Sequence, residues 1–448
     1  MPNRKVLVSV FSPQEAREAV LGGARIVDSE DPRSALGNIK PRQIMAVSDA
    51  VLHHSRGLDV QLSTNIGEDQ LLFRRTADGR AVQKTPYEIA GKAAQAALGV
   101  TVAMGHRVHP CPIVKVGLDG MDVGVLTDVL AEVVATLDRT EEHCHTQVMS
   151  VLFAQDLDLW ERRRTLPGVR RALVALREFH PADAGPGVFD LVDYAVGTLR
   201  DADGAVLFTD PGQVDLGSLV DRGVLPEDAT HTRVALTELY PHARFGLGAG
   251  RRTDRETIRR MVDATARAGA DAMMLDTSVL LKVARVGLVS AADSPELVAF
   301  EPLDVDAAGL DRQGVLSVDD LRFFVDYCHH RGLEANLAGS VTSYQAQQLW
   351  RLVPHLDHLS TRGGASAVRV DPAHPTGGGE DSRFATVIRR DLVRGYAPPE
   401  QSGHLCLPER VKGSAGPQVA ELRRRYPDLP LYWADREGRL TEVEENTP

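Results

Sequence analysis

The sequence predicts an α/β protein built on one (β/α)8 barrel, the TIM barrel. Eight short apolar runs recur along the chain, and helical patterns separate them, which is typical of parallel strands joined by helices. Eight repeats favour a closed barrel, because an open doubly wound sheet more often has about five or six strands. The length of 448 residues fits one such barrel that carries insertions.

Each predicted strand is a short run in which apolar side chains dominate. In chain order the runs are Lys5–Val10, Ala24–Asp28, Asp59–Ser63, Ile113–Val116, Gln147–Ala154, Ala272–Asp276, Glu334–Ala338 and His358–Thr361.

The helices between these strands carry start signals. Ser12 predicts the N-cap of the first helix, and Glu15 completes a capping box. Ser317 and Asp320 predict the same device before a later helix. Cys328 lies on the apolar face of that later helix, so we expect it in the core.

Two stretches do not fit a minimal barrel. A small insertion after strand three, about residues 69–85, is typical of a β-hairpin. A large insertion after strand five, residues 157–251, stands where a connection of about 2 to 6 residues is usual. It includes a predicted helix, 170–179, and a predicted hairpin, 193–208. Because βα loops line the mouth of such barrels, we predict a lid or an oligomerisation element.

The predicted domain organisation follows from these insertions. Residues 1–156 carry strands one to five, and residues 252–397 carry strands six to eight with phosphate-binding loops. Residues 398–448 form a C-terminal extension, whose acidic end, Glu442 to Glu445, we expect to lack regular structure.

Composition limits the possible functions. The net charge is −11 and the basic residues are dispersed, which argues against nucleic-acid binding. No run of about 18 apolar residues predicts a membrane span, and no signal-peptide pattern opens the chain. The four cysteines are far apart, so we expect reduced thiols and no metal site. We therefore expect a soluble cytoplasmic protein, a homo-oligomer, without nucleic-acid or membrane partners.

Strand-end polar residues indicate the chemistry, because they point into the active site of such a barrel. Lys115 lies within an apolar strand, Asp28 ends strand two and Asp276 ends strand six. An unpaired buried ammonium is costly. Lys115 could therefore be a Schiff-base nucleophile, a proton shuttle, a phosphate partner, or one half of a structural ion pair with an aspartate. Asp276 could act as general acid or base, with or without orienting Lys115, and Asp28 could take part or only cap the next turn.

Two glycine-containing loops predict a phosphate site. Gly339 and Ser340 follow strand seven, and Arg362, Gly363 and Gly364 follow strand eight. Such barrels bind phosphate at these loops through backbone N–H groups, and Arg362 would add a charged fork. The expected partner is a small phosphorylated substrate, although glycine there can also merely permit a tight turn.

The assembled residues resemble the (5-formylfuran-3-yl)methyl phosphate synthase family of methanofuran biosynthesis. The matching segments, which span most of residues 5–390, are Ser12-Pro13 with Glu15-Ala16 and Glu18-Ala19, Gly22-Gly23-Ala24 through Asp28 and Pro32, Leu36-Gly37, Lys115 to Leu118, Ala268 to Thr277, Leu337 to Ser340, and Arg362 to Ala365. The resemblance implies a lyase-type barrel enzyme that condenses triose phosphates without metal or organic cofactor, with Lys115 and Asp276 as catalytic residues.

Two positions depart from the family pattern. Glu30 and Leu280 stand where the family has lysines, and Lys282 or Lys40 could substitute for them. We expect a divergent relative that acts on a small phosphorylated carbonyl compound, with Asp28, Glu30 and Lys282 also in the catalytic set. The alternative is a catalytically lapsed barrel that binds a phosphorylated ligand as a sensor or partner subunit.

Overall fold

The computed structural model describes the part of the chain that forms the barrel and a C-terminal unit. The described residues are 4–30, 40–55, 59–65, 73–75, 81–83, 112–117, 123–140, 146–153, 199–200, 206–208, 214–215, 233–234, 255–277, 287–298, 314–368, 386–408, 412–413, 415–434 and 439–444.

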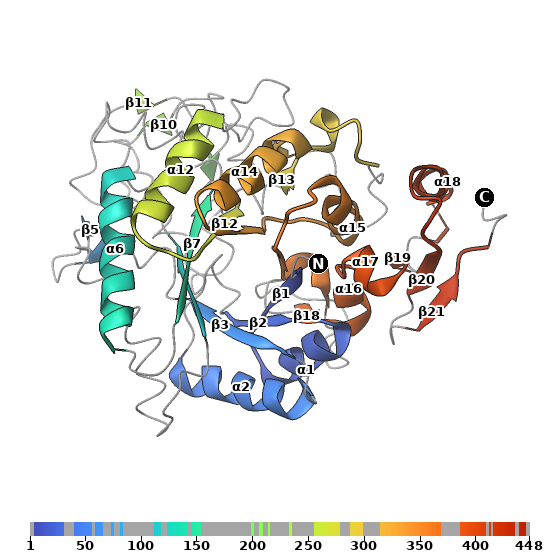
Figure 1. The fold of residues 1–448 in the computed structure, drawn as a ribbon, viewed down its shortest axis with the longest axis horizontal. Coiled ribbons are helices and arrows are strands. Elements are labelled where there is room, and N and C mark those ends of the chain that lie inside the picture. The colour runs from blue at the N-terminus through green and yellow to red at the C-terminus, as the bar shows by residue number, and fades with distance from the viewer. Residues whose placement is uncertain are drawn as a thin grey trace.

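Eight parallel strands form a closed barrel in the order β1-β16-β15-β12-β7-β6-β3-β2, which confirms the predicted (β/α)8 fold (Figure 1). The strands are β1 Lys5–Val10, β2 Ile26–Ser29, β3 Gln61–Asn65, β6 Ile113–Gly117, β7 Gln147–Phe153, β12 Ala272–Asp276, β15 Glu334–Leu337 and β16 His358–Thr361. Every predicted strand is present, and consecutive strands are neighbours around the ring.

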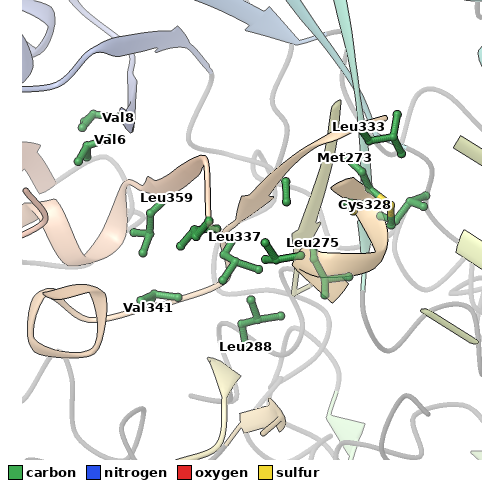
Figure 2. Close-up of a cluster of buried hydrophobic side chains, with 14 of the residues drawn as sticks. Val6, Val8, Met273, Leu275, Leu288, Cys328, Leu333, Leu337, Val341 and Leu359 are labelled. Atoms are coloured by element: carbon green, nitrogen blue, oxygen red, sulfur yellow. The ribbon is translucent and has the colours of Figure 1, made fainter. Parts of the chain in front are cut away.

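Alternation along the strands separates two apolar regions. One set of side chains fills the barrel interior, and it consists of Leu7, Ile26, Ile113, Met149, Val151, Phe153, Ala272, Met274 and Ala338. The intervening side chains point outwards and pack under the helices, as period-two alternation requires. Figure 2 shows this outer layer, in which Met273 lies close to Cys328 and Leu333 while Leu275 lies close to Leu337.

Helices surround the barrel and pack against one another in sequence. They are α1 Pro13–Gly22, α2 Pro41–Ser55, α6 Val123–Thr140, α12 Arg255–Arg267, α14 Val318–His330, α15 Ser343–Leu352 and α16 Arg390–Arg394. The contacting pairs are α1 with α2, α6 with α12, α12 with α14, α14 with α15, and α1 with α16. None of the described helices is both long and apolar enough to cross a membrane.

The predicted cap is complete at α14, whereas only one of its two hydrogen bonds is present at α1. Ser317 and Asp320 form a complete capping box at α14, and Cys328 on that helix is fully buried as expected. At α1, Ser12 accepts from the Glu15 N–H, but the Glu15 side chain does not return the bond. The Glu15 carboxylate instead accepts hydrogen bonds from the N–H of Phe11, the residue before Ser12, and from Arg362.

The predicted hairpin after the third barrel strand is present, because β4 Phe73–Arg75 pairs antiparallel with β5 Ala81–Gln83. In the large insertion, β8 Leu199–Arg200 pairs antiparallel with β9 Val206–Phe208, and β10 Val214–Asp215 pairs with β11 Arg233–Val234. The predicted helix 170–179 and the predicted strand 193–198 lie outside the described residues. The chain leaves the barrel at the carboxyl end of β7 and returns at the start of α12, so the insertion belongs to the face where βα loops gather.

Two further strand pairs near this face were not predicted. Strand β13 Gly287–Val289 pairs in parallel with β14 Gly314–Leu316, and β17 Ser366–Val368 pairs antiparallel with β18 Thr386–Ile388. Each strand has only three residues, too few to show a period in the sequence. Two 3₁₀ turns, Ala291–Asp293 and Gly363–Ala365, also lie in these connections.

The C-terminal extension is a small α/β unit. Helices α17 Pro399–Ser402 and α18 Gly416–Arg425 accompany a sheet of β19 Leu405–Pro408, β20 Leu431–Ala434 and β21 Leu440–Glu442. The unit has its own apolar cluster around Trp433 and lies beside α15 and α16 (Figure 1). Gln347 of α15 joins it to the barrel by bonding both backbone groups of Cys406. The expectation of an irregular acidic end was wrong for Glu442, which pairs with Tyr432.

Candidate active site

Lys115 lies inside the barrel and is paired with two carboxylates. Alternation along β6 turns its side chain inwards, and only 2% of it is exposed. The Nζ atom lies 2.7 Å from Asp28 Oδ2 and 3.2 Å from Glu30 Oε2. Asp28 comes from β2, and Glu30 follows the end of that strand, where its N–H donates to the Val10 carbonyl. Of the two alternatives for Asp28, the structure therefore favours participation in the cluster over capping of the next turn alone.

Two serine hydroxyls complete this cluster. Ser9 Oγ of β1 lies 3.1 Å from Asp28 Oδ2 and 2.9 Å from Glu30 Oε2, so it bridges the two carboxylates. Ser63 of β3 donates to the other oxygen of Asp28. Sequence reasoning missed both serines. The signal for them is a hydroxyl at an inward position of an otherwise apolar strand.

The pKa values follow from burial opposed by ion pairing. Burial by itself lowers the pKa of Lys115, but attraction by Asp28 and Glu30 outweighs it and places the pKa above its ordinary value. Burial likewise raises the pKa of Asp28, yet Lys115 and the hydrogen bonds of the cluster hold that pKa below its ordinary value. Lys115 is therefore an ammonium at neutral pH, and it must pass a proton to a neighbour before it can attack a carbonyl.

Asp276 does not pair with Lys115, which corrects that expectation. The Lys115 side-chain contacts go to Asp28 and Glu30. Through β7, Lys115 is in register with Ala272, and Asp276 lies four residues further along β12. Asp276 is buried at the barrel mouth, where its Oδ1 accepts from the Thr277 N–H at 2.7 Å. Strands β2 and β12 are opposite each other in the ring, so the two acidic positions face the mouth from opposite sides.

The turn after β15 is packed against the end of β12. Gly339 has φ +94°, and a Cβ there would lie 2.8 Å from the Thr277 nitrogen and 3.0 Å from Asp276 Oδ1, so only glycine fits. Ser340 follows with φ +56°, in the left-handed region that is unusual for serine. The Thr277 hydroxyl is buried and bonds to no other described residue.

The turn after β16 lies beside the first one. A Cβ on Gly364 would lie 1.8 Å from Tyr396 Oη and 3.2 Å from the Val341 carbonyl, so the backbone approaches both closely. Tyr396 also donates to that carbonyl at 2.8 Å. Within the described chain, the N–H groups of Ser340 and Gly363 donate to no acceptor. The two loops that the sequence singled out are thus neighbours, and backbone donors remain available in each.

Arg362 is not the open charged fork that the sequence predicted. Its guanidinium donates to both carboxylate oxygens of Glu15 at 3.3 Å and to the Ser9 carbonyl at 3.0 Å. Lys282 lies outside the described residues, and Lys40 is exposed just before α2. Among the described residues, no group of three His, Cys, Asp or Glu side chains is placed to hold a metal ion.

A comparison with protein families matches residues 6–164 to the 4-HFC-P synthase family. This segment carries the first five barrel strands together with Asp28, Glu30 and Lys115. The match confirms, over these residues, the resemblance that the sequence motifs indicated, because 4-HFC-P is the same phosphorylated furan aldehyde. No curated protein matches the chain in sequence.

Three solved structures with a similar arrangement are distant in sequence. A protein of Burkholderia cenocepacia J2315 assigned as a lyase/mutase shares 12% identity, with 89% of this chain and 92% of that chain covered and a TM-score of 0.38. A 2,3-dimethylmalate lyase of the PEP mutase/isocitrate lyase superfamily shares 9%, with 81% and 78% covered and a TM-score of 0.37. The tetrameric deoxyribose phosphate aldolase of Aeropyrum pernix shares 10%, with 80% and 86% covered and a TM-score of 0.34. The fold assignment rests on the closed strand order rather than on these likenesses.

Proposed function

We propose that the protein is a lyase-type biosynthetic enzyme related to 4-HFC-P synthase and acts on a small phosphorylated carbonyl compound. The observation that carries the proposal is the buried Lys115 ammonium, held between Asp28 and Glu30 inside the barrel. The family match over residues 6–164 covers all three groups and supports the same reaction class.

Burying an ion-paired cluster in a barrel costs free energy that an apolar filling would not. Taking charges out of water costs several kcal/mol per ion, and apolar side chains of similar volume often stabilise a fold equally well or better. The interior positions nearby are in fact filled by Met149, Val151 and Phe153. A lysine and two carboxylates in this place therefore favour a catalytic role over a purely structural one.

We propose that different parts of the substrate bind to different walls of the barrel. The turns at Gly339 and Gly363 offer backbone donors for a phosphate. Lys115 is less suited to that task, because Asp28 and Glu30 already neutralise its charge. The carbonyl group would then lie towards Lys115.

Lys115 can act on a carbonyl group by two routes, as a general acid or as a nucleophile. As a general acid, its ammonium gives a proton to the carbonyl oxygen while a base removes a proton from the adjacent carbon. As a nucleophile, it first passes a proton to Asp28 or Glu30, and the free amine then adds to the carbonyl carbon and expels water to form an imine. In this proposal Asp276, which is buried at the end of the opposite strand β12, is the second acid or base.

In this proposal the reaction, rather than the substrate class, departs from that of the family. Glu30 stands at a family lysine position and binds the remaining lysine, so a second imine cannot form there. We therefore propose triose-phosphate-like compounds as the substrate class, with a condensation or dehydration as the reaction. We also propose a homo-oligomer, and a lid or oligomerisation role for residues 157–251, supported by the connection from β7 to α12.

Borohydride trapping tests the proposal. Glyceraldehyde 3-phosphate and dihydroxyacetone phosphate are each incubated with the protein, reduced, and followed by intact mass and peptide mapping. K115R is the test variant, and K412R, at an exposed lysine, is the matched control. An adduct on Lys115 that K115R abolishes supports imine chemistry. Turnover that requires Lys115 without any adduct supports the general-acid route.

The alternative is a lapsed barrel that binds a phosphorylated ligand without turnover. The replacement of two family lysines motivates it. If K115A retained all turnover measured for the wild type, or if the folded wild type bound phosphate compounds but converted none, the binding function would replace the enzymatic one.

A further inference from the structure

A second polar network lies next to the Lys115 cluster and centres on the carboxylate of Glu15. This carboxylate accepts four hydrogen bonds, from the N–H of Phe11 at 2.6 Å, from two nitrogens of Arg362 at 3.3 Å each, and from the N–H of Ile388 at 3.3 Å. Its side chain is 6% exposed and that of Arg362 is 15% exposed. One side chain of α1 thus binds together β1, the end of β16, and β18.

Arg362 also links the two halves of the proposed site. Its Nη1 atom donates to the Ser9 carbonyl at 3.0 Å, and the hydroxyl of Ser9 bridges Asp28 and Glu30 in the Lys115 cluster. In the chain, Arg362 directly precedes the 3₁₀ turn that begins at Gly363. Arg362 therefore contacts β1 through its guanidinium and enters the phosphate turn through its backbone.

We propose that Glu15 and Arg362 are positioning residues that hold the phosphate turn after β16 at a set distance from Lys115, and so select the length of the substrate. The inference rests on the proposed function for the phosphate turn, but not for the link to Ser9. It assigns to Arg362 a role other than direct contact with phosphate.

Charge favours positioning over phosphate binding. The Glu15 carboxylate already neutralises the guanidinium through two hydrogen bonds. If Arg362 turned to a phosphate, Glu15 would remain as a buried carboxylate without its cation, which is strongly unfavourable. The arginine is therefore held where it is.

The substitution E15Q separates the two roles by the sign of its effect on inorganic phosphate binding, measured by calorimetry. Removing a negative charge and freeing Arg362 would tighten binding if the arginine were a phosphate ligand. If the pair only positions the turn, binding weakens, because a displaced turn no longer directs its backbone N–H groups at the phosphate. R362K keeps the charge but loses the fork, so it should also weaken binding.

E18Q is the matched control. Glu18 lies one turn further along α1 and pairs with Arg390 of α16 at 3.1 Å, without a link to Ser9. We expect E18Q to bind phosphate within about twofold of the wild type, because Glu18 pairs with Arg390 and not with Arg362, and a lost surface pair changes little. Tighter or unchanged binding in E15Q, or an equal loss in E18Q, would overturn the inference.

A second readout keeps the inference separate from the phosphate site. The rate at which an amine-selective reagent labels Lys115 is followed against pH by peptide mapping in wild type, E15Q, R362K and E18Q. We expect the labelling profile to shift in E15Q and R362K but not in E18Q, because a displaced Ser9 would no longer donate to Asp28 and Glu30, the partners of Lys115. If the wild type binds no phosphate, the proposed phosphate-binding role of the turn is wrong. The labelling profile then tests the positioning role by itself, and an unchanged profile in E15Q refutes that role.

Discussion

Replacing Lys115 by methionine should destabilise the protein strongly, and the loss should grow with pH. The substitution keeps the volume but removes the cation that lies 2.7 Å from Asp28 and 3.2 Å from Glu30. Removing one partner of a buried ion pair costs about 3–5 kcal/mol. Because two carboxylates lose their cation here, we expect K115M to fall in the upper part of that range at pH 8.

The pH dependence follows from the direction of each pKa. Asp28 has a lowered pKa in the folded wild type, so its stabilisation is complete above the unfolded value, about 3.9, and is lost as the pH falls through the folded value. Without Lys115, burial raises the pKa of Asp28, and stability then falls as the pH rises through the raised value. The difference between wild type and K115M should therefore widen from about pH 5 to pH 8.

Urea unfolding followed by far-UV circular dichroism measures both effects. The double variant D28N/K115M should be more stable than K115M at pH 8, because one buried unpaired carboxylate is gone. K412M, at an exposed lysine, is the control and should match the wild type. The loss of a buried pair is expected to cost more than about 1 kcal/mol. The reasoning would be refuted if the free energy of unfolding of K115M lay within about 1 kcal/mol of the wild-type value at pH 8 and the difference did not change with pH.

Two further predictions concern other parts of the barrel. G364A should lower the stability by about 1–3 kcal/mol, because the new Cβ would lie 1.8 Å from Tyr396 Oη, whereas G363A meets nothing within 4 Å and should change the melting temperature little; equal melting temperatures would contradict this account. At the opposite end of the barrel, a hydrogen bond from His358 lowers the pKa of Glu334, so this pair stabilises the protein above about pH 4.3 and loses that effect as the pH falls through the lowered value. Because Glu334 is half-exposed, E334Q should cost less than about 1 kcal/mol above pH 5, and this cost should vanish near pH 3 in urea titrations.

The eight barrel strands could be predicted because each is a local run of apolar residues bounded by helix signals. Strands β1, β12 and β16 begin and end where the sequence indicates. The paired strands β13 with β14 and β17 with β18 could not be predicted, because three-residue strands carry no period and form only when the barrel brings their partners together. The acidic end was misjudged for a similar reason, since β21 depends on pairing with β20.

For the candidate site, too, some features follow from the sequence and others only from the tertiary structure. The sequence by itself determined that Lys115 lies on the opposite face of its strand from Val114 and Val116, and the structure showed that this face is the barrel interior. It also determined that glycines are needed after β15 and β16. The tertiary structure alone decided that Lys115 pairs with Asp28 and Glu30 instead of Asp276, since the register of neighbouring strands sets which inward residues are level with one another. It likewise decided that Arg362 binds Glu15, a partner 347 residues away in the chain, because only closure of the barrel brings the last strand beside the first.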